Sequence, residues 1–106
     1  MANRSYTIAP ENDVVEIERT CTACPAQWEG KTRDNRPVYI RYRYGYLSVQ
    51  IGKPGEELMA SLRRQMEDGT PDFFGEQIGE DLDGFCELSD VRNALGERLR
   101  ITDKGK

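Results

Sequence analysis

The sequence contains no histidine, a single tryptophan and only three cysteines among its 106 residues. Without histidine, the chain cannot build a Ser-His or Cys-His catalytic pair or a histidine-ligated metal site. It also has no apolar run near the roughly 20 residues that span a bilayer, and its N-terminal MANRSYTIAP is not typical of a secretory signal. We therefore expect a cytoplasmic protein that makes no contact with membranes.

Enzyme signatures are absent as well. The sequence has no P-loop, no G-x-G-x-x-G, no G-x-S-x-G and no H-E-x-x-H, which are the motifs that place phosphates, dinucleotides, nucleophiles and catalytic metals. We therefore expect a protein that is not an enzyme. The length allows a single domain, residues 1–106, with one core, and we expect the tail at 103–106 to be frayed.

Charge is distributed unevenly along the chain, whose net charge is −4. Residues 26–53 hold six bases and two acids, whereas residues 66–90 hold nine acids and no base. A basic middle and an acidic second half predict two different surfaces. The alternative is that both are simply solvated faces.

The clearest structural signal is a β-hairpin over residues 37–52. Apolar and polar residues alternate on both sides of Tyr44-Gly45, a two-residue turn in which glycine supplies the positive φ. Pairing the two runs gives two consistent faces. The predicted apolar pairs are Tyr42 with Leu47, Ile40 with Val49 and Val38 with Ile51, and the predicted polar pairs are Arg43 with Tyr46, Arg41 with Ser48 and Tyr39 with Gln50.

A strand is also predicted immediately before the hairpin, over residues 27–33. A three-residue loop at 34–36 places Trp28, Gly30 and Thr32 on the apolar face. A two-residue loop would bury three charged side chains there instead, which costs several kcal/mol each. Further upstream, Tyr6, Ile8, Val15 and Ile17 recur with period two on either side of a turn at 10–13, which predicts two more short strands.

The second half of the sequence indicates helices. One helix is expected from Pro54 to Gly69, with Leu58, Leu62 and Met66 as its buried stripe. Phe74, Ile78 and Leu82 again recur every fourth residue after a start signal at 70–72 and predict a second helix, weakened by Gly75 and Gly79. The spacing predicts a third, short helix that begins at an N-cap Ser89 and carries Val91, Ala94 and Leu95. Residues 97–102 fit a helix or a strand equally well.

Strands followed by helices predict an α+β fold. We expect an antiparallel sheet of four to five strands in the N-terminal half, packed on one face by two to three helices from the C-terminal half. The covered face is predicted to comprise Trp28, Val38, Ile40, Tyr42, Leu47, Val49 and Ile51. The opposite face is predicted to carry Tyr39, Arg41, Arg43, Tyr46, Ser48 and Gln50.

The cysteines leave two interpretations open. Cys21 and Cys24 form a C-x-x-C pair that, together with Cys86, would supply three thiolates of a zinc site whose fourth ligand is missing. A redox site is disfavoured because a strand, rather than a helix, follows the pair. The other interpretation is that all three thiols are reduced and Cys86 is a small buried apolar residue. We expect no cofactor, with zinc as the alternative.

Two groups of side chains are candidates for partner binding. Tyr39, Arg41, Arg43 and Tyr46 would lie together on the hairpin, where they suit a protein interface or stacking on nucleic-acid bases; the alternative is an ordinary solvated strand face. The second group could imitate a phosphate backbone or simply keep the protein soluble. This second group comprises Glu76, Glu80, Asp81 and Asp83.

Two runs of sequence carry a resemblance. The pattern C-x-x-C-P-x-Q-W-E-G at 21–30, followed by Y-I-R-Y-R-Y-G-Y-L-S-V at 39–49, resembles small uncharacterised proteins of bacteria and their phages, over residues 21–52. Small acidic phage proteins often inhibit host defence, anti-CRISPR proteins among them. The resemblance therefore implies an inhibitor that binds a host macromolecule, and it assigns no role to any individual residue.

Together these observations predict a non-enzymatic binding protein that blocks or recruits a macromolecular partner, as a phage-type inhibitor of a host nucleic-acid-handling complex would. Its partner would be a protein or a protein–nucleic-acid complex. The alternative is a zinc-stabilised module that binds single-stranded nucleic acid directly on the sheet face. A symmetric homodimer is also open and would cover one of the two patches.

Overall fold

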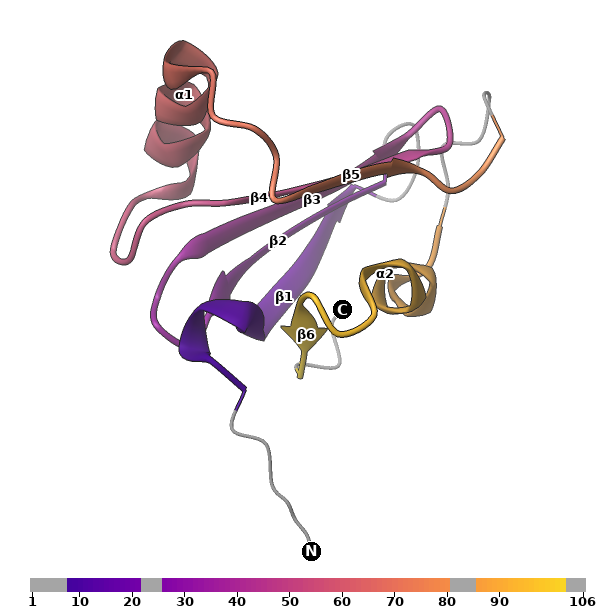
Figure 1. Ribbon diagram of the computed structural model, residues 1–106, viewed down its shortest axis with the longest axis horizontal. Coiled ribbons are helices and arrows are strands. Elements are labelled where there is room, and N and C mark those ends of the chain that lie inside the picture. Colours follow the sequence, from indigo (N-terminus) through magenta and orange to yellow (C-terminus); the bar gives the residue numbers. More distant parts are fainter. Residues whose placement is uncertain (1–7, 22–25, 81–85, 103–106) are drawn as a thin grey trace, which may run out of the picture.

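The computed structural model describes residues 8–21, 26–80 and 86–102. Its strands form one six-stranded sheet in the order β5-β4-β3-β2-β1-β6 (Figure 1), in which β6 runs parallel to β1 and all other neighbours are antiparallel. The elements are the 3-10 helix η1 (Pro10–Asn12), β1 (Asp13–Cys21), β2 (Ala26–Thr32), β3 (Pro37–Arg43), β4 (Tyr46–Ile51), α1 (Leu58–Asp68), β5 (Phe74–Gln77), α2 (Leu88–Leu95) and β6 (Arg100–Ile101).

The β3–β4 hairpin has the predicted register in all six residue pairs. Tyr44 and Gly45 have φ values of 55° and 77°, as a two-residue turn matched to the strand twist requires. A side chain at Gly45 would also collide with Gln77 and with the backbone oxygens of Gly79 and Glu80. The turn is therefore a place where a later segment packs closely, as well as the end of the hairpin.

The loop between β2 and β3 lies one residue earlier in the sequence than predicted. The N–H of Thr32 donates to the carbonyl of Arg36 at 3.0 Å, so the loop is residues 33–35 rather than 34–36. Trp28 consequently pairs with Ile40. The register moves by two residues, and because the side-chain period of a strand is also two, Trp28 keeps its predicted place in the core.

Strand β1 corrects the predicted period-two pattern around Val15. A register irregularity between Val14 and Glu16 places Val14 in the core beside Ile17 and leaves Val15 38% exposed. A bulge inserts one residue and changes which side chains face inward. The other half of that prediction, Tyr6, lies outside the described residues, and the predicted turn is the short helix η1.

The predicted second helix is wrong. Residues 74–77 form β5, which pairs with β4 at the edge of the sheet, and Phe74 is buried in the core. Ile78 is 38% exposed, and Leu82 lies outside the described residues. Pairing with an existing sheet edge overrode the four-residue spacing, because a segment containing two glycines has little intrinsic preference for a helix.

The third predicted helix is confirmed as α2, with a different start. Its N-cap is Glu87 rather than Ser89, and Glu87 and Asp90 form a reciprocal capping box. The ambiguous residues after it include β6, which pairs with Asp13 and Val14. The sheet therefore has six strands instead of four to five, because the C-terminal half contributes β5 and β6.

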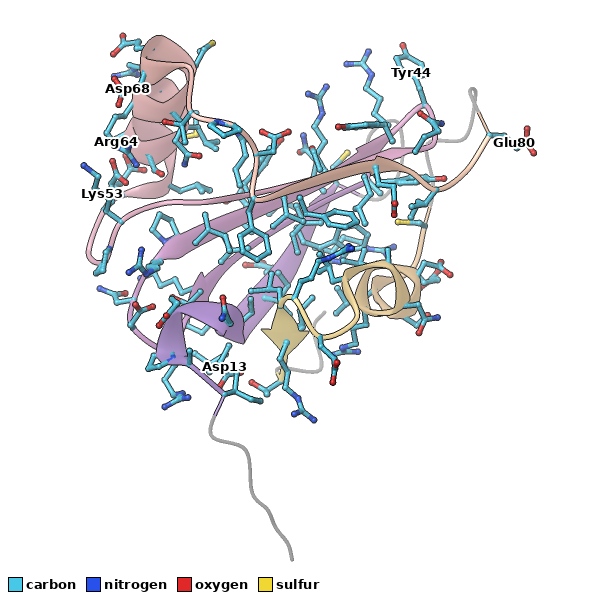
Figure 2. All side chains as sticks on the ribbon, viewed as in Figure 1. Asp13, Tyr44, Lys53, Arg64, Asp68 and Glu80 are labelled. Atoms are coloured by element: carbon cyan, nitrogen blue, oxygen red, sulfur yellow. The ribbon has the colours of Figure 1, made fainter. Side chains whose placement is uncertain are left out.

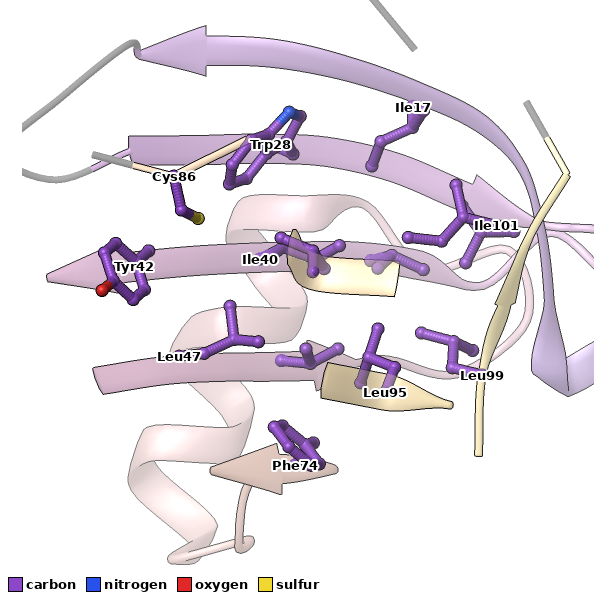
Figure 3. Close-up of a cluster of buried hydrophobic side chains, with 14 of the residues drawn as sticks. Ile17, Trp28, Ile40, Tyr42, Leu47, Phe74, Cys86, Leu95, Leu99 and Ile101 are labelled. Carbon is purple, nitrogen blue, oxygen red and sulfur yellow. The ribbon is translucent and has the colours of Figure 1, made fainter. Parts of the chain in front are cut away.

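The hydrophobic core lies between the sheet and α2 (Figure 3). The predicted covered face is confirmed, with Ile51 only partly buried. In the close-up, Trp28, Tyr42 and Cys86 lie together at one end of this layer. The buried apolar residues are Val14, Ile17, Ala26, Trp28, Val38, Ile40, Tyr42, Leu47, Val49, Phe74, Cys86, Val91, Leu95, Leu99 and Ile101.

Helix α1 lies on the other side of the sheet from α2 (Figure 1), so the expectation of helices on a single face is wrong. It ends at Gly69 as predicted but begins at Leu58 rather than at Pro54, because the Glu57 carboxylate caps it there. Its predicted apolar stripe is not its buried face: the helix buries Ser61 and Gln65, whereas Met66 is 77% exposed. The α+β class itself is confirmed. Among the described residues, no helix combines the length and the apolar character needed to cross a membrane.

Candidate interaction surface on the open face of the sheet

The face of the sheet that points away from α2 is called the open face here. Three of the predicted binding residues, Tyr39, Arg41 and Arg43, alternate along β3 on this face, and Tyr46 lies opposite Arg43 on β4. The structure therefore brings together all four residues of the predicted basic-aromatic patch, because strand alternation places every second side chain on one side.

Tyr39 and Arg41 form the half-buried inner part of this patch. The side-chain amide of Gln27 donates to the Tyr39 hydroxyl at 2.6 Å, and burial raises the pKa of Tyr39, so its phenol is neutral at pH 7. Arg41 Nε is fully covered and has no hydrogen-bond acceptor among the described residues. A covered donor without an acceptor carries a desolvation cost. This cost applies to the Nε atom of Arg41, the one side-chain atom among the described residues that is both buried and without a hydrogen-bond partner.

Arg43 and Tyr44 form the outer part of the patch. The Arg43 guanidinium lies over the Tyr44 ring, 4.8 Å from its centroid, and donates to the Tyr44 hydroxyl at 3.2 Å. Tyr44 is 56% exposed. Tyr44 was predicted only as a turn residue, although its place directly after Arg43 in a tyrosine-rich hairpin was a signal that it belongs to the patch.

Tyr46 extends the patch toward the edge of the sheet. Its side chain is 44% exposed, and its hydroxyl lies directly above Gly75 on β5, where any side chain would collide with it. The glycine that weakened the helix prediction for this segment thus leaves the space that the Tyr46 ring occupies.

Of the predicted acidic group, Glu76 and Glu80 lie in the described part of the chain. Glu76 is exposed and pairs with Leu47, whose side chain is in the core, so Glu76 projects from the side opposite Tyr46. Glu80 is exposed and its backbone packs on the hairpin turn, at the same end of the molecule as Tyr44 (Figure 2). Asp81 and Asp83 lie outside the described residues.

The open face has a second feature, which the sequence pattern did not predict. On β1 and β2, Glu16 lies opposite Lys31 and Glu18 lies opposite Glu29. Two carboxylates in directly opposed strand positions repel each other, and none of the described bases forms an ion pair with either one. The open face is therefore acidic over β1–β2 and basic and aromatic over β3–β4.

The loop that leads into α1, together with the first residue of the helix, forms a groove with the acidic half. This groove has a volume of about 680 Å³ and is lined by Glu16, Ile17, Glu18, Glu29, Gly30, Lys31, Asn35, Pro37, Gly55, Glu56, Glu57 and Leu58. Such a volume falls within the range of ligand-binding clefts.

The start of α1 is held by two glutamates in this groove. The Glu57 carboxylate caps the helix by accepting from the N–H groups of Met59 and Ala60, both at 3.1 Å. The Glu56 carboxylate accepts two hydrogen bonds from Arg64, at 2.7 and 3.0 Å. The Arg64 guanidinium lowers the pKa of Glu56 to about 2. Both side chains are thus committed to positioning α1.

The three cysteines are distributed as follows. Cys21 pairs with Gln27 in the β1–β2 register and is partly buried, Cys86 is in the core beneath the sheet, and Cys24 lies outside the described residues. Among the residues with assigned positions, no three Cys, Asp or Glu side chains come together as a metal site. A zinc site that includes Cys24 stays a prediction.

The chain was also compared with known proteins. No protein-family model, curated protein or solved structure matches the chain.

Proposed function

We propose that this protein is a non-enzymatic binding protein whose open face contacts a macromolecular partner. One observation carries the proposal: the outer part of the basic-aromatic patch is open to solvent, with Arg43 exposed and Tyr44 and Tyr46 about half exposed. Tyrosine and arginine are enriched among the residues that dominate binding energy at protein interfaces.

The charge pattern of the open face favours a protein over a nucleic acid as the partner. Stacked bases would suit the tyrosines, and phosphates would suit Arg41 and Arg43. A nucleic-acid strand that continued across the open face, however, would meet the carboxylates of Glu18 and Glu29, which repel phosphates. A protein surface carries both signs of charge and can complement both halves of the face.

The mode of action in this proposal is inhibition by occupancy. A small acidic protein that covers a functional surface of a nucleic-acid-handling complex needs affinity and shape, and it needs no catalytic group. This part of the proposal is supported by the small size and the net negative charge of the chain. The contact residues at the open face support binding itself.

The test is a capture experiment with matched charge reversals. The protein would be immobilised and exposed to bacterial lysate as wild type, as Arg43→Glu and as Arg100→Glu. Arg43 and Arg100 are both exposed, but Arg100 lies on β6, separated from β3 by β1 and β2 in the sheet order. We expect the wild type and Arg100→Glu to retain the same protein partner and Arg43→Glu to lose it, with all three melting at similar temperatures.

Two outcomes would overturn this proposal. If Arg43→Glu retains the partner as well as Arg100→Glu does, the basic-aromatic patch is not the contact surface. If the wild type instead binds a labelled single-stranded oligonucleotide, with an affinity that falls steeply with salt, direct nucleic-acid binding replaces the protein partner. Zinc in that protein, measured by native mass spectrometry and lost in Cys86→Ser, would support the zinc-stabilised alternative.

A further inference from the structure

The groove at the start of α1 contains more carboxylates than bases. Five glutamates and one lysine line it. Glu56 and Glu57 are committed to α1, and Glu16 lies opposite Lys31. Glu18 and Glu29 remain as an opposed pair of like charges on neighbouring strands. Opposed like charges destabilise a sheet, and a cation placed between them would relieve that repulsion.

The same groove has an apolar wall. Leu58 and Pro37 line it beside the acidic floor, and Leu58 and Leu62 on α1 are only partly buried, while Met59 is 60% exposed. The side of α1 that faces the sheet is polar, through Ser61 and Gln65. The most exposed apolar side chains of α1, Met59 and Met66, are therefore turned away from the sheet, whereas Leu58 lies at the wall of the groove.

We propose that this groove binds a short basic segment of the partner protein that also carries an apolar side chain. Lysine or arginine side chains of that segment would lie between Glu18 and Glu29, and its apolar side chain would pack on Leu58 and Pro37. This inference rests on the proposed function, because it assigns the chemistry of one part of the partner. It concerns the acidic half of the open face, whereas the basic-aromatic patch contacts another part.

Electrostatic complementarity is the reason for choosing a basic occupant. A groove lined by five glutamates, of which only Glu56 forms an ion pair among the described residues, attracts cations and rejects acidic or phosphate-bearing ligands. The positive end of α1 does not reverse this preference, because the Glu57 carboxylate already accepts from its first N–H groups. An apolar anchor is needed as well, because exposed ion pairs contribute little affinity by themselves.

The test uses labelled peptides and one charge reversal. Three short fluorescein-labelled peptides would be titrated with the protein by fluorescence anisotropy: one alternating lysine and leucine, one alternating lysine and serine, and one alternating glutamate and leucine. We expect only the lysine–leucine peptide to bind well. Glu18→Lys should weaken its binding by about tenfold or more, which corresponds to ~1.4 kcal/mol.

The design separates loss of binding from loss of structure. Glu18→Lys places a base opposite Glu29 and should leave the melting temperature unchanged or slightly higher. The matched control is Glu97→Lys, the same substitution at an exposed position outside the groove, which should bind the peptide as the wild type does.

Three results would overturn the inference. Equal binding of the lysine–leucine and lysine–serine peptides would mean that the groove attracts any cation. Unchanged binding in Glu18→Lys would place the peptide elsewhere. A concentration-dependent dimer in sedimentation, dissociated by Glu18→Lys, would identify the basic segment as this chain's own β3 in a second copy. Each result is independent of the capture experiment with Arg43→Glu, which tests the proposed function alone.

Discussion

The two helices of this protein lie on opposite faces of the sheet (Figure 1) and bury different kinds of side chain. Helix α2 has eight residues and buries Val91 and Leu95 almost completely in the core. Helix α1 is longer, with eleven residues, yet its buried side chains are Ser61 and Gln65, joined by a hydrogen bond of 2.9 Å. Met66 on its outer side is 77% exposed.

This difference indicates separate roles for the two helices. Removing α2 would expose the core, so α2 unfolds only with the whole domain. Helix α1 is held largely by polar contacts, such as the bidentate Arg64–Glu56 pair, and those contacts can open locally at a lower free energy. A helix that can move at a low free-energy cost, and that exposes apolar side chains such as Met59 and Met66, is well suited to border a binding groove. The predictions below test this contrast.

The largest effect is expected from a core substitution in α2. Leu95 is 1% exposed, so Leu95→Ala should lower the free energy of unfolding by about 2–5 kcal/mol, through lost burial and the cavity left behind. The matched change in α1, Leu62→Ala at a half-buried position, should cost about 1 kcal/mol. Urea unfolding followed by the fluorescence of the single tryptophan, Trp28, which is buried beneath the sheet, measures both.

Equal losses in the two variants would contradict the contrast. Because Trp28 reports on the core, hydrogen exchange of the α1 amides provides the complementary measurement for Leu62→Ala. In Leu62→Ala we expect the amides of residues 58–68 to exchange faster, while the amides of the sheet strands exchange at nearly their wild-type rates.

An intermediate, pH-dependent effect is expected at the start of α1. The Arg64 guanidinium lowers the pKa of Glu56 from 4.5 to about 2. A carboxyl whose pKa is depressed in the folded state contributes stability above its unfolded pKa and loses it as pH falls through the folded value. Helix α1 should therefore loosen as pH falls from about 5 toward 2. NMR titration of the Glu56 carboxyl carbon measures this directly.

The control for this titration is Arg64→Gln, which removes the cation and should return the Glu56 pKa toward its ordinary value. A Glu56 carboxyl that titrates near 4.5 in the wild type would mean that the ion pair does not hold α1 in solution.

The smallest effect is expected on the outer surface of α1. Met66→Gln replaces a side chain that is 77% exposed and should change the free energy of unfolding by less than about 0.5 kcal/mol. A loss above 1 kcal/mol would mean that Met66 is covered in solution, by a second copy or by another segment of the chain. Denaturation at two protein concentrations separates these causes, since only dimerisation depends on concentration.

Parts of the candidate site could be predicted from the sequence. Strand alternation and the Tyr44-Gly45 turn were enough to place Tyr39, Arg41, Arg43 and Tyr46 on one face, because a hairpin with a two-residue turn has one register. The same argument missed the opposed Glu18 and Glu29, because their pairing depends on a β1 register that bulges make irregular. It also missed the groove, since a helix and two distant strands form it.

What the sequence by itself determined is local: the β3–β4 hairpin, the inward side of Trp28, the end of α1 at Gly69, and a polar face carrying tyrosine and arginine. Each follows from periodicity or from the backbone preference of a few adjacent residues. Only the tertiary structure decided that residues 74–77 join the sheet as β5, that α1 crosses to the open face, and that Ser61 rather than Met66 lies beneath it. Those outcomes depend on which surfaces meet across long sequence separations, where the free energy of burial outweighs local preference.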